Sequence, residues 1–289
     1  MRRRPVLALV AGSVLGTSCA GPEPGPRAPS LPLEITVATW NLRLNTPADG
    51  LNAWPLRREA VKALILRHGF DVLGTQEGLA DQIDELAGLP GYAQVGVGRD
   101  DGRRAGEFAA IFYRRERFAA VDHGDFWLSE TPERPSRGWD ARCCNRLASW
   151  ARLREPASGR EFVVLSVHFD HEGAVARRES ARLVLRRLRQ IAGDLPAVCV
   201  GDFNATPASE PIRLMTAALR DAREAALEPP AGPVGTFNGF AAEAPLNERI
   251  DYVFVGPGWR VLRYAALDDR HAGRWPSDHL PVMTRLALD

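Results

Sequence analysis

The sequence predicts a single α/β domain that begins near residue 34. From Glu34 onward, short apolar runs rich in β-branched residues alternate with stretches of helical spacing. The chain shows neither a second linker nor an internal repeat, and its 289 residues suffice for one large core. With 45% apolar and 25% charged residues, the composition excludes a disordered, fibrous or multi-pass membrane protein.

The first 20 residues have the layout of a secretory signal peptide: a basic start, an apolar run over 6–15, and small residues. The run is too short to span a bilayer. Two outcomes remain open, namely lipid attachment at Cys19 or ordinary cleavage after Ala20, and the stretch resembles a bacterial lipoprotein signal. Residues 21–33 are rich in Pro and Gly and predict an extended linker. Either outcome places the domain outside the cytoplasm, secreted or held in the cell envelope by a lipidated Cys19.

Seven apolar runs of strand length are predicted to be β-strands, each buried on at least one face. In chain order they are ITVATWN (35–41), FDVLGTQE (70–77), AAIFYR (109–114), EFVVLSVHF (161–169), AVCVGDFN (197–204), IDYVFV (250–255) and LPVMTRLAL (280–288).

Two segments between these strands have helical spacing. Pro55 opens the first, and its apolar positions are Leu56, Ala60, Val61, Leu64 and Ile65. The second runs from about 175 to 191 and carries leucines among many arginines. Residues 221–249, which include PPAGP and NGF, are expected to form a loop.

The formal net charge of the whole chain is +1, and removal of Arg2, Arg3 and Arg4 with the signal would leave 34 basic against 36 acidic residues. A strong overall attraction to nucleic acid is therefore not indicated. Arginines cluster within 99–117 and 177–189. We interpret these clusters as solvated faces, with a charged rim of a binding site as the alternative.

Three cysteines follow Cys19, namely Cys143, Cys144 and Cys199. An exported protein can form disulfides, but the number is odd, and adjacent cysteines bridge only with strain. Cys199 lies in an apolar run and is expected to be a small buried residue. No cysteine spacing suggests a zinc site.

Four polar side chains stand at or just beyond the carboxyl ends of predicted strands: Asn41, Glu77, His168 and Asp202. Ligand sites form at such strand ends. These side chains would converge if their strands are neighbours, so the sequence predicts one polar site at this edge.

A set of short motifs runs along the chain in a fixed order. They are TWNLR (Asn41), TQE (Glu77), GEFAAIFYR (Glu107), SVHFDH (His168, Asp170), GDFN (Asp202, Asn204), RIDYVF (Asp251) and SDH (Asp278, His279). Over residues 35–289 this ordered set resembles the endonuclease/exonuclease/phosphatase superfamily, metal-dependent phosphoesterases that include DNase I-like nucleases, abasic-site endonucleases, sphingomyelinases and inositol polyphosphate phosphatases. The resemblance implies a four-layer α/β sandwich, in which two mostly antiparallel sheets pack face to face with helices outside.

The resemblance also implies a divalent cation, Mg²⁺ or Mn²⁺. Glu77 offers a hard oxygen ligand, and Asn41 can add an amide oxygen or orient the other ligands. Asp278 is expected to complete a second metal position. Oxygen donors without a Cys/His cluster argue against zinc.

The two histidines of the motifs are the expected proton carriers. His279 is the candidate general base toward water or a contact to the phosphoryl oxygens, and the family pattern assigns Asp251 to orient its ring. The resemblance to nucleases of the DNase I type implies that His168 contacts the phosphate and serves as an acid, with Glu107 as its carboxylate partner. For Glu107, an ordinary surface carboxylate is the alternative.

Asp202 and Asn204 would border the scissile phosphate, Asp202 positioning the water or helping with the metal and Asn204 donating to a phosphoryl oxygen. Strand alternation after His168 would turn Asp170 into the site and His171 away from it. The Trp- and Arg-rich segment 126–153 resembles a stretch of exported bacterial members of the superfamily, and its Arg146 is expected to point toward substrate. Its tryptophans suit either stacking on a substrate or core packing.

The expected function is that of an exported, divalent-metal-dependent phosphodiesterase acting on nucleic acid, DNA or RNA, or on nucleotide-like diesters. A phosphomonoesterase or lipid head-group phosphodiesterase of the same fold is the first alternative. A binding module that has lost catalysis is the second, and it is disfavoured because competent residues fill the main positions. Beyond a phosphate-ester substrate and the membrane tether through Cys19, no protein partner is predicted.

Overall fold

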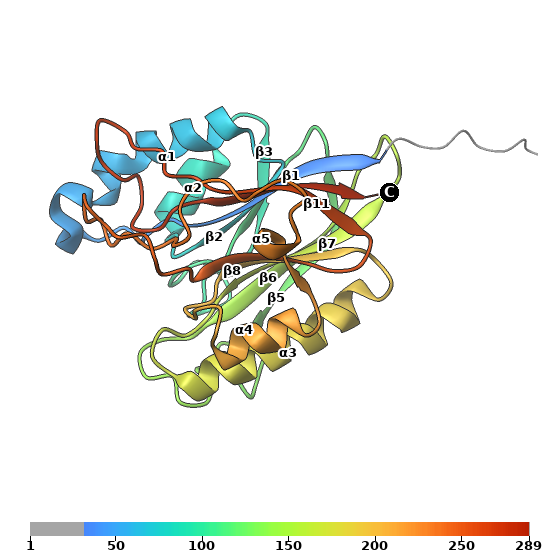
Figure 1. The fold of residues 1–289 in the computed structure, drawn as a ribbon. Coiled ribbons are helices and arrows are strands. Elements are labelled where there is room, and N and C mark those ends of the chain that lie inside the picture. Colours follow the sequence, from blue (N-terminus) through green and yellow to red (C-terminus); the bar gives the residue numbers. More distant parts are fainter. Residues whose placement is uncertain (1–31, 289) are drawn as a thin grey trace, which may run out of the picture. The chain divides into compact units, whose positions relative to one another are not determined.

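The computed structural model describes residues 32–288, in which two six-stranded sheets pack face to face (Figure 1). The first sheet has the order β11 (Trp259–Ala266), β12 (Val282–Leu288), β1 (Leu33–Asn41), β2 (Val72–Gln76), β4 (Ile111–Arg114) and β3 (Tyr92–Val95). The second has the order β5 (Ala119–Trp127), β6 (Leu147–Arg154), β7 (Glu161–His168), β8 (Ala197–Asp202), β10 (Asp251–Val255) and β9 (Arg220–Asp221). Each sheet contains one parallel pair, β1–β2 and β7–β8, and its other pairs are antiparallel.

Helices cover the outer face of each sheet (Figure 1). The helices on the first sheet are α1 (Trp54–His68) and α2 (Ala80–Ala87), preceded by the short η1 (Pro47–Asn52), and those on the second are α3 (Ala174–Ala192) and α4 (Glu210–Thr216). The short α5 (Ala222–Ala225) directly follows β9. Helix, sheet, sheet and helix make four layers, which confirms the predicted α/β sandwich.

Alternation along β1 shows how the sequence builds these layers. Leu33, Ile35 and Val37 face the core between the sheets, whereas Ala38 and Trp40 pack under the helices. The sheets approach closely at Gly74 of β2, where a Cβ would lie 2.4 Å from Val200 Cγ2 of the opposite sheet. A side chain at this glycine would push the two sheets apart.

The structure corrects several boundaries. Leu33 was predicted to end the linker, but it is buried and pairs with Leu288, so it is the first residue of β1. Segment 126–153 contains the end of β5 and most of β6 on either side of a loop. In the segment expected to be a loop, 221–249, the chain forms only the end of β9 and the one-turn α5. The predicted signal peptide, Cys19 and the linker up to residue 31 lie outside the described residues.

The cysteines of the domain divide as a pair and a single residue. Cys199 is buried and free, as expected, and burial raises the pKa of its thiol. Cys143 and Cys144 form a disulfide, although the sequence argued against pairing between neighbours.

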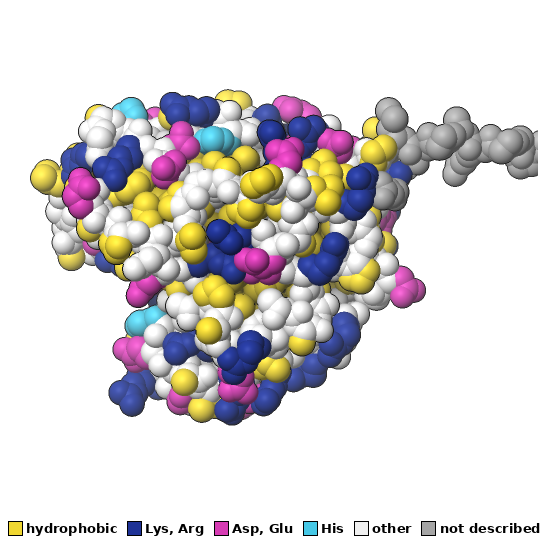
Figure 2. Space-filling model, viewed as in Figure 1, with side chains coloured by type: hydrophobic (Ala, Val, Ile, Leu, Met, Phe, Trp, Pro, Cys, Tyr) yellow, Lys and Arg dark blue, Asp and Glu magenta, His cyan; other side chains and the backbone are white. Residues whose placement is uncertain are grey.

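Between residues 32 and 288, none of the helices combines the length and the apolar character that a bilayer crossing requires. Figure 2 shows Lys and Arg side chains mixed with Asp and Glu side chains over one face of the molecule, rather than gathered into a continuous basic field.

Candidate active site

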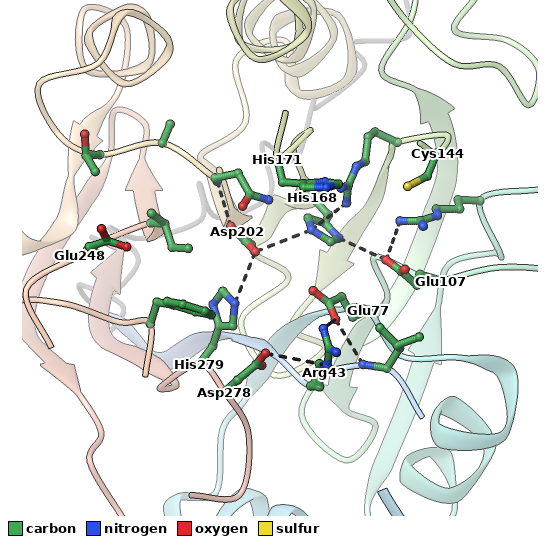
Figure 3. Close-up of a pocket in the computed structure, with 18 residues that line it drawn as sticks. Arg43, Glu77, Glu107, Cys144, His168, His171, Asp202, Glu248, Asp278 and His279 are labelled. Carbon is green, nitrogen blue, oxygen red and sulfur yellow. Dashed lines mark hydrogen bonds and ion pairs between the residues drawn. The ribbon is translucent and has the colours of Figure 1, made fainter. Parts of the chain in front are cut away.

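A polar cavity of about 580 Å³ lies where the parallel strand pairs of the two sheets end (Figure 3). Strands β1 and β2 bring Asn41 and Glu77 to this edge, and β7 and β8 bring His168 and Asp202. The predicted site residues that line the cavity are Glu77, Glu107, Arg146, His168, Asp202, Asn204, Asp278 and His279. Residues separated by up to about 200 positions in the chain therefore meet in one place, as the motif order led us to expect.

Asn41 is fully buried beneath the cavity and links the two sheets. Its amide nitrogen donates to Glu77 Oε1 at 2.8 Å and to Asp202 Oδ2 at 3.0 Å. Its amide oxygen accepts from the backbone N–H of Arg43 at 2.9 Å. Of the two roles expected for Asn41, this geometry favours orienting the carboxylates over ligating a metal. Glu77 itself has a left-handed φ of 63°, a strained conformation in a residue whose side chain lines the cavity.

Asp202 occupies the centre of the site, between two histidines (Figure 3). It is the register partner of His168 across β7–β8 and of Asp251 across β8–β10. Asp202 Oδ2 lies 3.7 Å from His168 Nε2 and 3.9 Å from His279 Nε2. Burial and the neighbouring Asp251 raise the pKa of Asp202 to about 7, although His279 opposes the shift.

His279 is held from behind by a buried carboxylate. Its Nδ1 donates to Asp251 Oδ2 at 2.9 Å, and the Thr236 hydroxyl donates to the same oxygen at 2.6 Å. Burial alone would lower the pKa of His279, but Asp251, Asp202 and Asp278 together raise it well above its ordinary value. A protonated imidazole is a hydrogen-bond donor, which favours phosphoryl contact over the alternative role of general base.

His168 is hydrogen-bonded to a guanidinium, whereas His279 is hydrogen-bonded to a carboxylate. Arg146 donates from Nη1 to His168 Nε2 at 2.8 Å and from Nη2 to His171 Nδ1 at 2.7 Å. Because guanidinium only donates, His168 is neutral with its proton on Nδ1. Burial, and then the charge of Arg146, lower the pKa of His168 well below its ordinary value.

Glu107 is the carboxylate nearest to the Nδ1 side of His168, at 3.6 Å from that atom. Its side chain is only 14% exposed, which removes the surface-carboxylate alternative. Arg99 Nη1 donates to Glu107 Oε2 at 2.5 Å. Burial raises the pKa of Glu107 to about 7 even though Arg99 opposes the shift.

Asp170 and His171 exchange the positions expected for them. Strand β7 ends at His168, and Asp170 is buried in the turn that follows, where it accepts from the backbone N–H groups of Glu172 and Gly173. Its other oxygen lies 3.5 Å from Arg146 Nε, so Asp170 supports Arg146 rather than lining the cavity. His171 does line the cavity. The alternation argument was wrong here because it extended the strand by two residues.

Asn204 and Asp278, the remaining predicted residues, have different neighbours. Asn204 has a left-handed φ of 47°; its backbone N–H donates to Asp202 Oδ1 at 2.8 Å and its amide donates to the Phe169 carbonyl at 3.0 Å. Asp278 Oδ2 lies 3.9 Å from Arg43 Nε, and burial raises the pKa of Asp278. Both residues line the cavity.

Donor atoms of Glu77, Asp202 and His279 all lie within 4.8 Å of one another. A protonated His279 has no lone pair for a metal, so the carboxylates of this group, and not the imidazole, could hold a divalent cation. Carboxylate oxygens suit Mg²⁺ or Mn²⁺, so these residues fit the expected cofactor. Asp278 is not part of this group, and its carboxylate lies 3.9 Å from Arg43 Nε. Cys143, Asp170 and His171 also lie close together, but Cys143 is in the disulfide and Arg146 contacts both other side chains, which excludes a cation there.

Arg57 of α1 is a buried residue that the sequence analysis did not single out. Its guanidinium donates to four backbone carbonyls: Asn52 at 2.8 Å, Leu42 at 2.5 Å, Pro276 at 3.0 Å and Arg43 at 2.6 Å. The loop after Asn41 is thereby tied to the loop before Asp278. Burial lowers the pKa of Arg57 to about 10. No motif could reveal this residue, because its partners are backbone carbonyls, and one of them, that of Pro276, lies 219 residues away in the chain.

Phe237 and Thr236 were also missed, since they lie in the segment expected to be a variable loop. The Phe237 ring packs edge-on against His279 at 5.1 Å and lines the cavity. The Thr236 backbone accepts from Leu280 N at 2.7 Å, which holds this segment beside the SDH motif.

Residues 38–279 match the family model described as the endonuclease/exonuclease/phosphatase family. Among solved structures, the fold is similar to that of a family protein from Bacteroides thetaiotaomicron, with TM-score 0.86 and 39% identity over 90% of this chain and 100% of that one. A mannosyl-6-phosphatase from the same organism gives TM-score 0.83 and 38% identity over 87% of this chain and 99% of that one.

Among curated proteins, Drosophila melanogaster nocturnin is 30% identical over 214 residues, which are 64% of this chain and 31% of nocturnin. The chain thus spans only about a third of the length of this relative. The region that matches the family model, residues 38–279, includes the whole set of motifs from Asn41 to His279. This chain therefore belongs to the endonuclease/exonuclease/phosphatase family, with its DNase I-like fold, and is a phosphoric ester hydrolase.

Proposed function

We propose that the protein is a divalent-metal-dependent phosphomonoesterase that acts on small phosphorylated compounds. The observation that carries this proposal is the position of Asp202 between His168 and His279, on the floor of a cavity that also holds Glu77. This arrangement offers a proton acceptor, a charged donor and a cation ligand around one point. Phosphoester hydrolysis requires these three functions.

Each side chain has a distinct role in this proposal. Asp202, with a pKa of about 7, accepts the proton of the attacking water near neutral pH. His279, kept protonated by Asp251, donates a hydrogen bond to a phosphoryl oxygen, and Arg146 donates to another. Glu77 would hold the cation, which when bound neutralises phosphate charge and polarises the phosphoryl group.

The cavity favours a small substrate. Its volume of about 580 Å³ is in the range typical of small-molecule sites. Several arginines of the clusters within 99–117 and 177–189 are already paired with carboxylates; these pairs are Arg99–Glu107, Arg104–Asp84, Arg117–Asp71, Arg182–Glu179 and Arg187–Glu133. Paired arginines offer less attraction to a polyanion than free ones. The similar mannosyl-6-phosphatase also supports a monoester substrate.

A phosphodiesterase acting on DNA, RNA or nucleotide-like diesters is the second candidate, and the motifs alone favoured it. The observation in its support is that Arg43, Arg99 and Arg146 border the cavity, where they could contact phosphates flanking a scissile diester.

The test compares p-nitrophenyl phosphate, a monoester, with bis-p-nitrophenyl phosphate, a diester, using purified protein with Mg²⁺ or Mn²⁺. We expect faster monoester hydrolysis, which a chelator abolishes and which Glu77→Gln and His279→Ala lower by at least 100-fold. Faster diester hydrolysis would favour the second candidate. A fully active His279→Ala protein would refute the roles given above.

We also propose that the enzyme works outside the cytoplasm, on the basis of the signal-like residues 1–20. Mass spectrometry of the protein purified from its own cells should find either a lipid-modified Cys19 or a chain starting at Gly21. Detection of the uncut amino terminus in the cytoplasmic fraction would contradict export.

A further inference from the structure

A second polar groove adjoins the active-site cavity. It has a volume of about 660 Å³ and is lined by Arg99, Asp100, Arg137, Cys143, Cys144 and Asn145. Arg99 and Cys144 line both spaces. Figure 3 shows Cys144 and Glu107 on the same side of the active-site cavity, opposite Glu248. A substrate whose phosphate lies near Asp202 could therefore extend its other end into this groove.

The polar groups of the groove are held in place by the surrounding chain. The Arg99 carbonyl accepts from Trp127 Nε1 at 2.7 Å and from Asn145 Nδ2 at 3.3 Å. Arg137 Nη1 donates to the Arg142 carbonyl at 2.6 Å. Such fixed groups can bind a ligand without first losing conformational freedom, which favours affinity.

Room for the Asp100 carboxylate depends on a glycine. Gly106 has a left-handed φ of 78°, and a Cβ there would lie 2.4 Å from Asp100 Oδ2. Any other residue would displace this carboxylate and strain the backbone. The turn that carries Asp100 is closed by a hydrogen bond from Asp100 N to the Ala105 carbonyl at 3.0 Å.

The chemistry of the groove narrows the class of ligand. Arg99 is paired with Glu107, and the positive charge of Arg137 is matched by Asp100 in the lining, so the groove has no excess of cations for a second phosphate. No aromatic ring is among the residues that line it, so a nucleobase would find no stacking partner there. The lining combines guanidinium and amide donors with one carboxylate acceptor. A hydroxyl group both donates and accepts, so neighbouring hydroxyls of one molecule would satisfy both kinds of group.

We infer that this groove, the leaving-group groove, binds the alcohol part of a phosphomonoester and that this alcohol is a neutral polyhydroxylated compound such as a hexose. The inference rests on the proposed function and specifies its substrate class. In the reaction, a water oxygen bonds to phosphorus, the bond from phosphorus to the sugar oxygen breaks, and that oxygen takes up a proton. The products are inorganic phosphate and the free sugar.

The experiment measures kcat and KM with Mg²⁺ for mannose 6-phosphate, fructose 1,6-bisphosphate, 5′-AMP and p-nitrophenyl phosphate. The wild-type protein should have a kcat/KM for mannose 6-phosphate at least tenfold above those for 5′-AMP and the bisphosphate. In Asp100→Ala and in Arg137→Met, the ratio of kcat/KM for mannose 6-phosphate to that for p-nitrophenyl phosphate should fall at least fivefold, through KM. General damage to the fold would lower both values together and leave the ratio unchanged.

Arg134→Met is the matched control, because Arg134 is exposed on the same loop as Arg137 but lines neither space. It should leave the ratio at the wild-type value. A wild-type preference for 5′-AMP or the bisphosphate, or an unchanged ratio in both groove variants, would overturn the inference while leaving a phosphomonoesterase in place. Failure to hydrolyse any of the four compounds would instead overturn the proposed function, and this inference with it.

Discussion

At the scale of single residues, the two histidines of the cavity differ in charge because their neighbours differ. Carboxylates surround His279 and raise its pKa, whereas a guanidinium donates to His168 and burial lowers its pKa. Near neutral pH, His279 is therefore protonated and His168 is neutral. This division gives the site a charged donor without adding a second positive charge beside Arg146.

Asp251→Asn tests the charge of His279. Loss of the Asp251 carboxylate removes the main favourable interaction of the imidazolium, so the pKa of His279 should fall and the ring should lose its proton at lower pH. We expect activity at neutral pH to fall roughly 100-fold. NMR titration of the metal-free protein measures the pKa directly. Asp269→Asn is the control, since Asp269 pairs with His68 instead; an unchanged pKa of His279 in Asp251→Asn would contradict this explanation.

Arg57→Lys tests whether the buried guanidinium positions the catalytic loops. A lysine has one donor atom and cannot reach four carbonyls, so carbonyls of the loops after β1 and before β12 would lose partners. We expect a loss of about 2 kcal/mol of stability and a fall in kcat of roughly tenfold. Arg58→Met is the control, because Arg58 is partly exposed and its surface ion pairs contribute about 0–1 kcal/mol. Equal effects of both substitutions on kcat would show that Arg57 has no positioning role.

At the scale of elements, the parallel pair β7–β8 sets the distance between His168 and Asp202. Gly201, which pairs with Val167 next to the end of the two strands, allows them to approach closely there. Its φ is 153°, and a Cβ would lie 2.1 Å from the Val167 carbonyl oxygen. A side chain here would force β8 away from β7 next to the central carboxylate.

Gly201→Ala should therefore lower both stability and activity. We expect a destabilisation of about 2 kcal/mol or more and a loss of most activity as Asp202 moves from the two histidines. Denaturant unfolding and steady-state kinetics measure the two effects. Gly159→Ala is the control for backbone strain alone, because Gly159 also has a positive φ of 73° but open space around it. If Gly201→Ala lowered stability and activity no more than Gly159→Ala does, the close packing of β8 on β7 would not be what positions Asp202.

Sequence predicted the elements that carry the site better than those that surround it. Strands β1, β2, β7, β8, β10 and β12 are apolar and mostly buried, so hydrophobic runs revealed them. Strand β5 was missed because only its last two residues are buried, and β3 because it has only four residues. Strand β6 was hidden by the tryptophans and arginines that made its segment resemble a substrate loop.

In the candidate site too, the sequence predicted the residues that stand at strand ends and missed those whose position depends on the complete fold. Strand ends predicted that Asn41, Glu77, His168 and Asp202 converge, because a parallel pair brings its carboxyl ends to one edge. The position of Asp170 could not be predicted, because it depends on where the chain leaves β7. Arg57 could not be predicted at all, because its contacts are backbone carbonyls brought together only by the complete fold.

At the scale of the whole molecule, one edge of a two-sheet sandwich collects ligands from both sheets. Glu77 follows a strand of the first sheet, and Asp202 ends a strand of the second. A cation held by Glu77 would lie beside Asp202, where the two sheets meet, and its binding would stabilise the folded state relative to the unfolded chain.

Mg²⁺ or Mn²⁺ at 100 times its dissociation constant should accordingly stabilise the protein by about 2.7 kcal/mol. For a domain of this size, that corresponds to an increase in Tm of roughly 5–10 °C. Thermal unfolding with and without chelator measures the shift. Glu77→Gln should remove most of it, whereas Asp269→Asn should retain it. An equal shift in Glu77→Gln would place the cation elsewhere.

A crystal structure of the Mn²⁺-soaked protein with anomalous data would test directly whether a hydrolase site is assembled around Glu77 and Asp202. The structure predicts an anomalous peak beside the Glu77 carboxylate, within the group that also contains Asp202 and His279. A strong peak only at Cys143, Asp170 and His171, or no peak in the cavity at saturating Mn²⁺, would contradict the account.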